Sequence, residues 1–193
     1  MARDAIIALA GVGIGGLVTI VGNLVQTRYH ELRSRKALAG SLAGEIEGII
    51  RAVERRNYID GLDRIIQRQR EVRQRTAAAP GQQSLVQAPI RITFPAFGVR
   101  ISFNYFSVFD KACDKIGVLG DISGEVALFY TLAKGIVEDL NSLREGVQFL
   151  SVDEVIDFHQ RLRDLLAEQL ARGRQVADRL RKIQDRKFLC LFG

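Results

Sequence analysis

The sequence is poor in the residues that build disulfide, metal and cofactor sites. Its 193 residues include only two cysteines, two histidines and no tryptophan. Two cysteines far apart in the chain exclude a disulfide-dense scaffold and a multi-cysteine zinc site. No phosphate-binding glycine loop with its lysine and no nucleophile elbow occurs either. We therefore expect no catalytic residue, no cofactor and no metal, although this scarcity disfavours an enzyme without excluding one.

Proline is also scarce, and none precedes Pro80. One helix can therefore run from the start of the chain to about residue 57. Its first part, residues 5–25, carries no charged side chain. As a helix this stretch is about 31 Å long, close to the hydrocarbon thickness of a bilayer. The pattern predicts a transmembrane anchor within residues 1–26.

Three other interpretations of residues 5–25 compete with the anchor. A signal peptide cleaved after Ala10 would have too short an apolar core. The glycines at 11, 13 and 16 match a dinucleotide-binding fingerprint, but no second strand follows them. A buried helix of a water-soluble core remains an alternative, although uninterrupted apolar runs of this length more often span membranes.

Basic residues follow this apolar segment and predict its orientation. Only Arg3, beside Asp4, precedes it, whereas four cations follow it closely: Arg28, Arg33, Arg35 and Lys36. The positive-inside rule then places the short N-terminus outside and everything after Gln26 in the cytosol. The same four cations are candidates to meet anionic lipid headgroups, although a merely solubilising flank predicts the same orientation.

Glycines spaced by four residues predict close helix packing. Two of them, Gly11 and Gly15, lie in the apolar segment, and three follow in the helix after it: Gly40, Gly44 and Gly48. Such spacing lets two backbones approach closely, either between identical chains or within one chain. The expected partners are accordingly the lipid bilayer and a second copy or another helical protein.

The remainder predicts a mainly α fold with a small β-hairpin as a candidate insert. Residues 27–76 are predicted as juxtamembrane helices, residues 77–89 as a linker, and residues 90–193 as a cytosolic helical domain. Apolar residues alternate with polar ones at 90–94 and 99–103, around a proline- and glycine-containing turn. This periodicity predicts a hairpin over residues 90–103.

Three helices are expected after the hairpin, over residues 105–116, 123–144 and 151–187. The last has the clearest start, because Ser151 and Glu154 form a capping box. Its apolar stripe is long for a small domain and suits a coiled-coil-like partner. Gly173 is a candidate bend within it.

Two short segments carry a resemblance. They are Ile116-Gly117-Val118-Leu119-Gly120 and Leu128-Phe129-Tyr130-Thr131-Leu132. Together with the general layout, they resemble a group of uncharacterised small bacterial membrane proteins with an N-terminal span and a cytosolic helical domain. The resemblance covers about 30 residues and implies an inner-membrane location, but it transfers no functional residue.

Six aromatic residues gather in and after the predicted hairpin: Phe94, Phe97, Phe103, Tyr105, Phe106 and Phe109. Such a cluster can form a domain core, line a ligand pocket or enter the membrane interface. The pocket interpretation predicts a membrane-tethered enzyme or ligand-binding domain that uses the aromatic region 94–109. The core interpretation is the more usual one.

Charged residues suggest few specific sites. His159 lies near Asp157 and Glu154, but not at the three- or four-residue spacing that helical metal ligands need. The chain has 28 basic and 22 acidic residues, and the acidic ones are interspersed among the arginines of the helices. Mixed charges indicate solvated helix faces and disfavour nucleic-acid binding, although arginine-rich helices could hold anionic lipid or nucleic acid. We therefore expect a single-pass membrane-anchored helical interaction or scaffold module.

Overall fold

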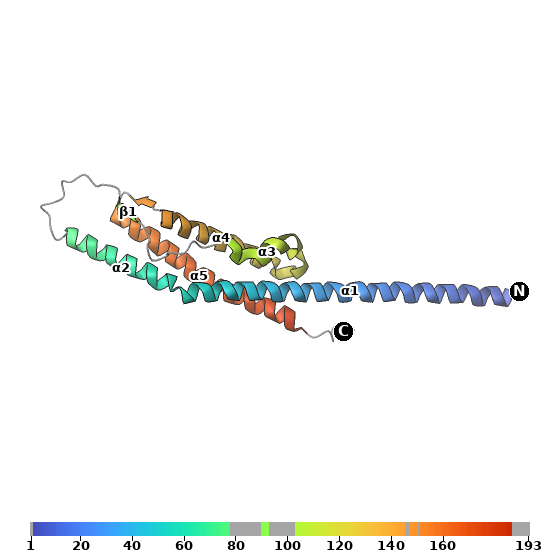
Figure 1. The fold of residues 1–193 in the computed structure, drawn as a ribbon. Helices are drawn as coiled ribbons and strands as arrows, with labels where there is room; N and C mark the ends of the chain where they lie inside the picture. Colours follow the sequence, from blue (N-terminus) through green and yellow to red (C-terminus); the bar gives the residue numbers. More distant parts are fainter. Residues whose placement is uncertain (1, 78–89, 93–102, 146, 150, 187–193) are drawn as a thin grey trace.

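A computed structural model describes residues 2–77, 90–92, 103–145, 147–149 and 151–186, and the fold is mainly α (Figure 1). Side-chain surroundings are described for residues 18–75, 105–142, 148–149 and 151–186. The elements, in chain order, are α1 (Ala2–Arg55), α2 (Tyr58–Ala77), β1 (Ile90–Ile92), the 3₁₀ helix η3 (Phe103–Phe106), α3 (Ser107–Ala112), the 3₁₀ segment η4 (Cys113–Ile122), α4 (Ser123–Glu145), β2 (Val147–Phe149) and α5 (Val152–Asp185).

Helix α1 is a single helix of 54 residues, and its first half projects beyond the other helices (Figure 1). It ends at Arg55 without a proline or glycine. Asn57 takes a left-handed conformation with φ 49°, which asparagine tolerates better than most residues. Its N–H donates to the carbonyl of Glu54 at 3.0 Å, and its carbonyl accepts from the N–H of Gly61. This single residue therefore ends α1 and starts α2.

Helix α5 lies antiparallel to α1 and then to α2. Four ion pairs mark its course, in order along the chain: Glu47 with Arg181 at 2.8 Å, Glu54 with Arg174 at 2.5 Å, Asp63 with Arg163 at 3.2 Å, and Arg73 with Asp153 at 3.1 Å. Residue numbers rise on α1 and α2 while they fall on α5. The apolar stripe of this long helix is therefore covered from within the chain.

Two hydrophobic clusters lie along α5. The first joins α1, η4, α4 and the C-terminal half of α5, and includes Leu42, Ile46, Phe129, Tyr130 and Leu180. The second joins α2, β2, the end of α4 and the N-terminal half of α5, and includes Leu62, Leu140 and Leu162. Residues 27–76 thus share their cores with the helices that follow residue 103.

The predicted hairpin requires a correction. Strand β1 pairs antiparallel with β2, in the register Ile90 with Phe149 and Ile92 with Val147. Of the predicted partner strand, residues 99–102 lie outside the described residues, and Phe103 belongs to η3. Phe149, which is buried, links the pair to the second cluster. The pairing partner comes from the segment between α4 and α5, about 55 residues away in sequence.

The helix predicted over residues 105–116 is also different in the structure. It is divided among η3, α3 and η4, and η4 continues past Gly117 to Ile122. Gly120 breaks the helical geometry with φ 73°. The start of α5 is confirmed, because the Ser151 hydroxyl accepts a hydrogen bond from the Glu154 N–H at 3.2 Å.

Candidate functional site

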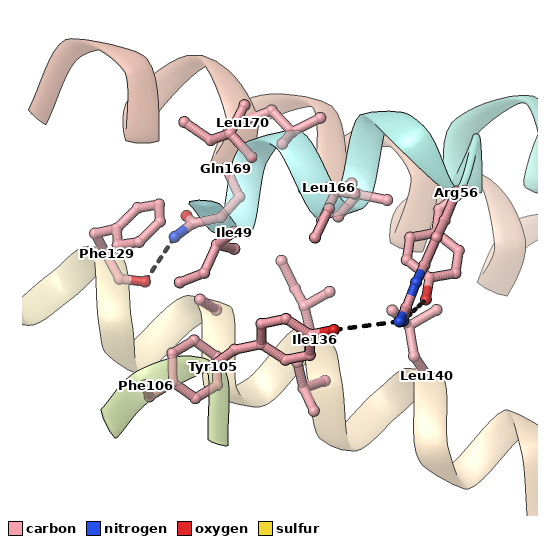
Figure 2. Close-up of a pocket in the computed structure, with 16 residues that line it drawn as sticks. Ile49, Arg56, Tyr105, Phe106, Phe129, Ile136, Leu140, Leu166, Gln169 and Leu170 are labelled. Carbon is pink, nitrogen blue, oxygen red and sulfur yellow. Dashed lines mark hydrogen bonds between the residues drawn. The ribbon is translucent and has the colours of Figure 1, made fainter. Parts of the chain in front are cut away.

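An apolar cavity of about 60 Å³ lies between α1, α4 and α5 (Figure 2). It is lined by aliphatic side chains of these helices, among them Ile49, Ile136, Leu166 and Leu170, and by Tyr105 and Phe106 from η3. Arg56 and Tyr58, on either side of the turn between α1 and α2, line it as well.

Three polar groups surround one end of this cavity. The Arg56 guanidinium donates hydrogen bonds to the hydroxyls of Tyr58 at 2.8 Å and Tyr105 at 3.2 Å (Figure 2). These contacts raise the pKa of Arg56 above its ordinary value, mainly through the bond to Tyr58, so the group stays cationic. Gln169 is buried at the opposite side, and its amide N–H donates to the Phe129 carbonyl at 2.6 Å.

The size of the cavity limits what it can hold. Sites for drug-sized molecules occupy about 300–1,000 Å³. The observed space of about 60 Å³ is enough for water or for a few carbon atoms. Since the Gln169 amide N–H is already bonded to the Phe129 carbonyl, the cavity walls offer little for a polar ligand to bind inside the space. The arrangement is therefore closer to a packing gap than to a substrate site.

A carboxylate from α1 organises the aromatic residues. Glu45 accepts hydrogen bonds from the backbone N–H groups of Val108 at 2.6 Å and Phe109 at 3.1 Å, which caps the start of α3. It also accepts from the Tyr130 hydroxyl at 2.8 Å. Burial, the bond to Glu45 and nearby carboxylates raise the pKa of Tyr130 well above its ordinary value. The Phe109 ring stacks on Tyr130, with centroids 4.0 Å apart.

The six predicted aromatic residues are thus divided. Phe106 is buried in the first cluster, and Phe109 packs against it, as a core interpretation predicts. Lys134 lies 5.4 Å from the centroid of the Phe109 ring and pairs with Asp110 at 2.6 Å. Tyr105 is the member at the mouth of the cavity. Phe94 and Phe97 lie outside the described residues, and so do the surroundings of the Phe103 side chain.

The glycines of the predicted packing set have different surroundings. A Cβ on Gly40 would lie 2.8 Å from the Gln184 side chain of α5, so this glycine lets α1 and α5 of one chain approach. Gly44 and Gly48 face open space. The surroundings of Gly11 and Gly15 lie outside the described residues.

The four cations after the apolar segment also separate into two kinds. Arg28 is exposed and forms a 3.7 Å ion pair with Glu31, and Arg33 is exposed as well. Arg35 and Lys36 instead turn toward the bundle, where they donate to the carbonyls of Leu119 and Arg186. Only Arg28 and Arg33 are therefore exposed to the surroundings, as a lipid-facing flank requires.

His159 is a core residue. It is completely buried, and its Nδ1 lies 2.5 Å from the Val155 carbonyl oxygen. Burial lowers its pKa below the ordinary value. Within the described part of the chain, no group of three His, Cys, Asp or Glu side chains is arranged to hold a metal ion.

One described segment has the length and apolarity of a membrane span. It is Ser107–Ser142, with a mean hydropathy of 1.3, and 39% of its most apolar window is buried in the bundle. Phe129, Tyr130 and Ala133 of this segment belong to the first cluster. Core helices pass the same test of length and composition, so this feature is compatible with membrane association but does not demonstrate it.

Comparison with family models, with curated proteins and with solved structures finds no match to the chain. The resemblance suggested by the two short segments therefore stays an expectation. One of those segments supplies Gly120 and the other Phe129 and Tyr130, and their places in the fold follow from packing alone.

Sequence reasoning did not single out Glu45, Arg56, Tyr58 or Gln169. For two of these four residues, the sequence does contain a recognisable signal. Glu45 and Gln169 are polar residues at positions where the helical periodicity of their neighbours calls for an apolar one. Arg56 and Tyr58 carry no such signal, because their meeting depends on the left-handed conformation of Asn57.

Proposed function

We propose that this protein is a single-pass membrane-anchored helical interaction module, with its N-terminus outside and its bundle in the cytosol. The observation that carries the proposal is the form of α1. Its apolar first half projects from the bundle, while its second half supplies Leu42 and Ile46 to the first cluster. One continuous helix would thus connect the bilayer to the domain core.

Exposed apolar side chains support the anchor. Along the described part of the projecting segment, Val18 is 67% exposed and Leu24 is 60% exposed, and Ile20, Val21 and Val25 are exposed too. Water-exposed apolar side chains over consecutive turns of a helix are unfavourable, whereas a bilayer solvates them. Ser107–Ser142 is less suited to this role, because many of its apolar side chains already fill the core.

Membrane partition of the full chain with its native N-terminus tests the anchor. We expect the chain to pellet with membranes and to resist extraction by salt and alkali. Replacing Val18 and Ile20 by arginine together should release it, because arginine within a span is unfavourable, by up to about 2.5–3.5 kcal/mol each at the centre. The matched control adds the same two charges at Ser34 and Ala37, which are exposed on the same helix beyond the span. A parent chain that stays in the high-speed supernatant without detergent refutes the anchor.

The interaction role has its own support. Leu128 and Leu132 on α4 are one turn apart and are 46% and 36% exposed. Paired apolar residues on an exposed helix face are a common form of contact surface. Self-association is the expected interaction, and chemical crosslinking with native mass spectrometry in detergent measures it. We expect lysine at both positions to abolish it, and lysine at the exposed Gln67 and Gln74 of α2, away from this face, to leave it intact. A strictly monomeric parent chain rules out self-association.

A ligand-binding domain is the alternative that the central cavity favours. Its mouth combines one guanidinium with two tyrosine hydroxyls, which suits a small apolar molecule with an acceptor group. The volume of about 60 Å³ restricts such a ligand to a few atoms. Filling the space with Ala133→Leu separates the two functions, since it should remove ligand binding but leave membrane partition and association unchanged.

A further inference from the structure

A second hollow, of about 210 Å³, opens between α1, η4 and α5. We call it the basic cleft. Besides two isoleucines, its walls carry four cations and one carboxylate. These are Arg35, Arg179, Lys182, Arg186 and Asp121. The cleft lies where the C-terminal end of α5 runs beside α1, on the side from which the first half of α1 projects (Figure 1).

The charges of the basic cleft are unbalanced. Arg179 is the only one of its cations with an ion pair inside the described part of the chain, since it pairs with Asp121 at 3.5 Å and with Glu125. The lone carboxylate of the cleft is thereby already engaged. Arg35, Lys182 and Arg186 are left with three positive charges around one hollow. Three other arginines of α5, by contrast, pair with acidic residues of α1 and α2: Arg163, Arg174 and Arg181.

Arg35 is held in place by the backbone of η4. Its Nη2 donates to the Leu119 carbonyl at 2.8 Å. Gly120 lies directly against it, because a Cβ at this position would be 3.3 Å from Nη2, and φ 73° also favours glycine there. The Nε of Arg35 is buried and has no hydrogen-bond partner among the described residues. The bond to Leu119 thus fixes the Arg35 guanidinium at the wall of the cleft without pairing its charge.

We propose that the basic cleft binds a phosphate group. Guanidinium and ammonium donors form short, charge-assisted bonds with phosphate oxygens, and a phosphate fits a hollow of this size. Arg35 lies ten residues after Val25, which is about 15 Å along α1. The headgroup layer is about 5–8 Å thick on each side of the hydrocarbon, so the cleft stands within about one Debye length of it. The phosphate can accordingly belong to a lipid headgroup or to a soluble anion.

Thermal unfolding of the full chain in nanodiscs tests this proposal and separates the two sources. In the first arm, the nanodiscs contain only phosphatidylcholine, and inorganic phosphate is compared with chloride at equal ionic strength. In the second arm, phosphatidylglycerol is added to the nanodiscs without free phosphate. The variant Lys182→Gln with Arg186→Gln removes two exposed cations of the cleft. The control Arg68→Gln with Arg75→Gln removes two exposed cations of α2.

We expect inorganic phosphate or phosphatidylglycerol to raise the unfolding temperature of the parent and of the α2 control. Binding of the same phosphate group should be roughly tenfold or more weaker in the cleft variant. An effect of inorganic phosphate identifies a soluble ligand, and an effect of phosphatidylglycerol alone identifies a headgroup. No effect in either arm overturns the proposal. Equal losses in the cleft variant and the α2 control also overturn it, because they indicate a general charge effect. The first arm depends only on the cleft, so its result stands even if the membrane anchor is refuted.

Discussion

Among the glycines whose surroundings the structure describes, Gly173 of α5 has the least room for a side chain. A Cβ at this position would lie 2.7 Å from Cε2 of Phe129 on α4 and 3.2 Å from Cδ1 of Ile50 on α1. Both neighbours are buried, so neither side chain can move into solvent. We therefore predict that Gly173→Ala forces the three helices apart locally. Overpacking of this kind costs about 1–3 kcal/mol.

The matched variant is Gly135→Ala on α4, where a Cβ meets no atom within 4 Å. Both substitutions replace a glycine inside a helix, and each gains about 1 kcal/mol from helix propensity. The difference between the two variants therefore isolates the packing cost. We expect Gly135→Ala to stabilise the bundle and Gly173→Ala to be less stable than it by about 1–3 kcal/mol, which corresponds to a difference of about 2–12 °C in Tm for a chain of this size.

Far-ultraviolet circular dichroism of the full chain in detergent micelles measures this difference. Gly173→Leu extends the series and should lower Tm further, because its side chain has no space to enter. The reasoning is refuted if Gly173→Ala melts at the same temperature as Gly135→Ala. That result would mean that α1, α4 and α5 are not in close contact at this height.

Three further predictions concern buried or half-buried polar groups, and each is measured by thermal unfolding. Glu45→Gln should lower stability by about 1–3 kcal/mol, because it removes the charge that accepts from the N–H groups of Val108 and Phe109. The pKa of Tyr130 is raised in the fold, so its contribution is fully present below a pH of about 10 and is lost as the pH rises further. Tyr130→Phe should remove this alkaline loss. The pKa of His159 is lowered in the fold, so its contribution is present above a pH of about 6.5 and is lost as the pH falls; His159→Leu should flatten this acid limb.

Exposed residues of the same type serve as controls. Glu138→Gln on α4 should leave stability within about 0.5 kcal/mol of the parent, as surface substitutions usually do. His30→Gln on the projecting part of α1 should leave the acid limb in place, since this residue is exposed. A parent chain with constant Tm from neutral to mildly acidic pH contradicts the assignment of His159 as a buried neutral residue.

Helix positions were largely predictable because their signals are local. The absence of proline predicted that α1 would run to about residue 57, and it ends at Arg55. The capping box placed the start of α5 at Ser151, where the cap is observed. Such signals depend on side chains within one or two turns, which is why the sequence alone is sufficient for them.

The parts that were not predicted depend on contacts between distant segments. The strand at residues 90–92 alternates clearly, but nothing local indicates that its partner is the segment between α4 and α5. Leu165 shares the helical stripe of α5 by spacing, yet it is 46% exposed, because α4 and α2 cover the neighbouring faces and not this one. Glu45 and Gln169 interrupted their stripes visibly, but their partners could be identified only from the fold.

The antiparallel pairing of α1 with α5 has a consequence for synthesis. Glu47 and Arg181 are 134 residues apart, so α1 leaves the ribosome long before its main packing partner exists. At about 5–20 residues per second, the wait is roughly 7–27 s. During this interval the face of α1 that packs against α5 has no cover, and it is open to chaperones and to other nascent chains. We expect folding of this bundle to be completed only after α5 has been synthesised, with chains truncated before α5 cleared by proteolysis.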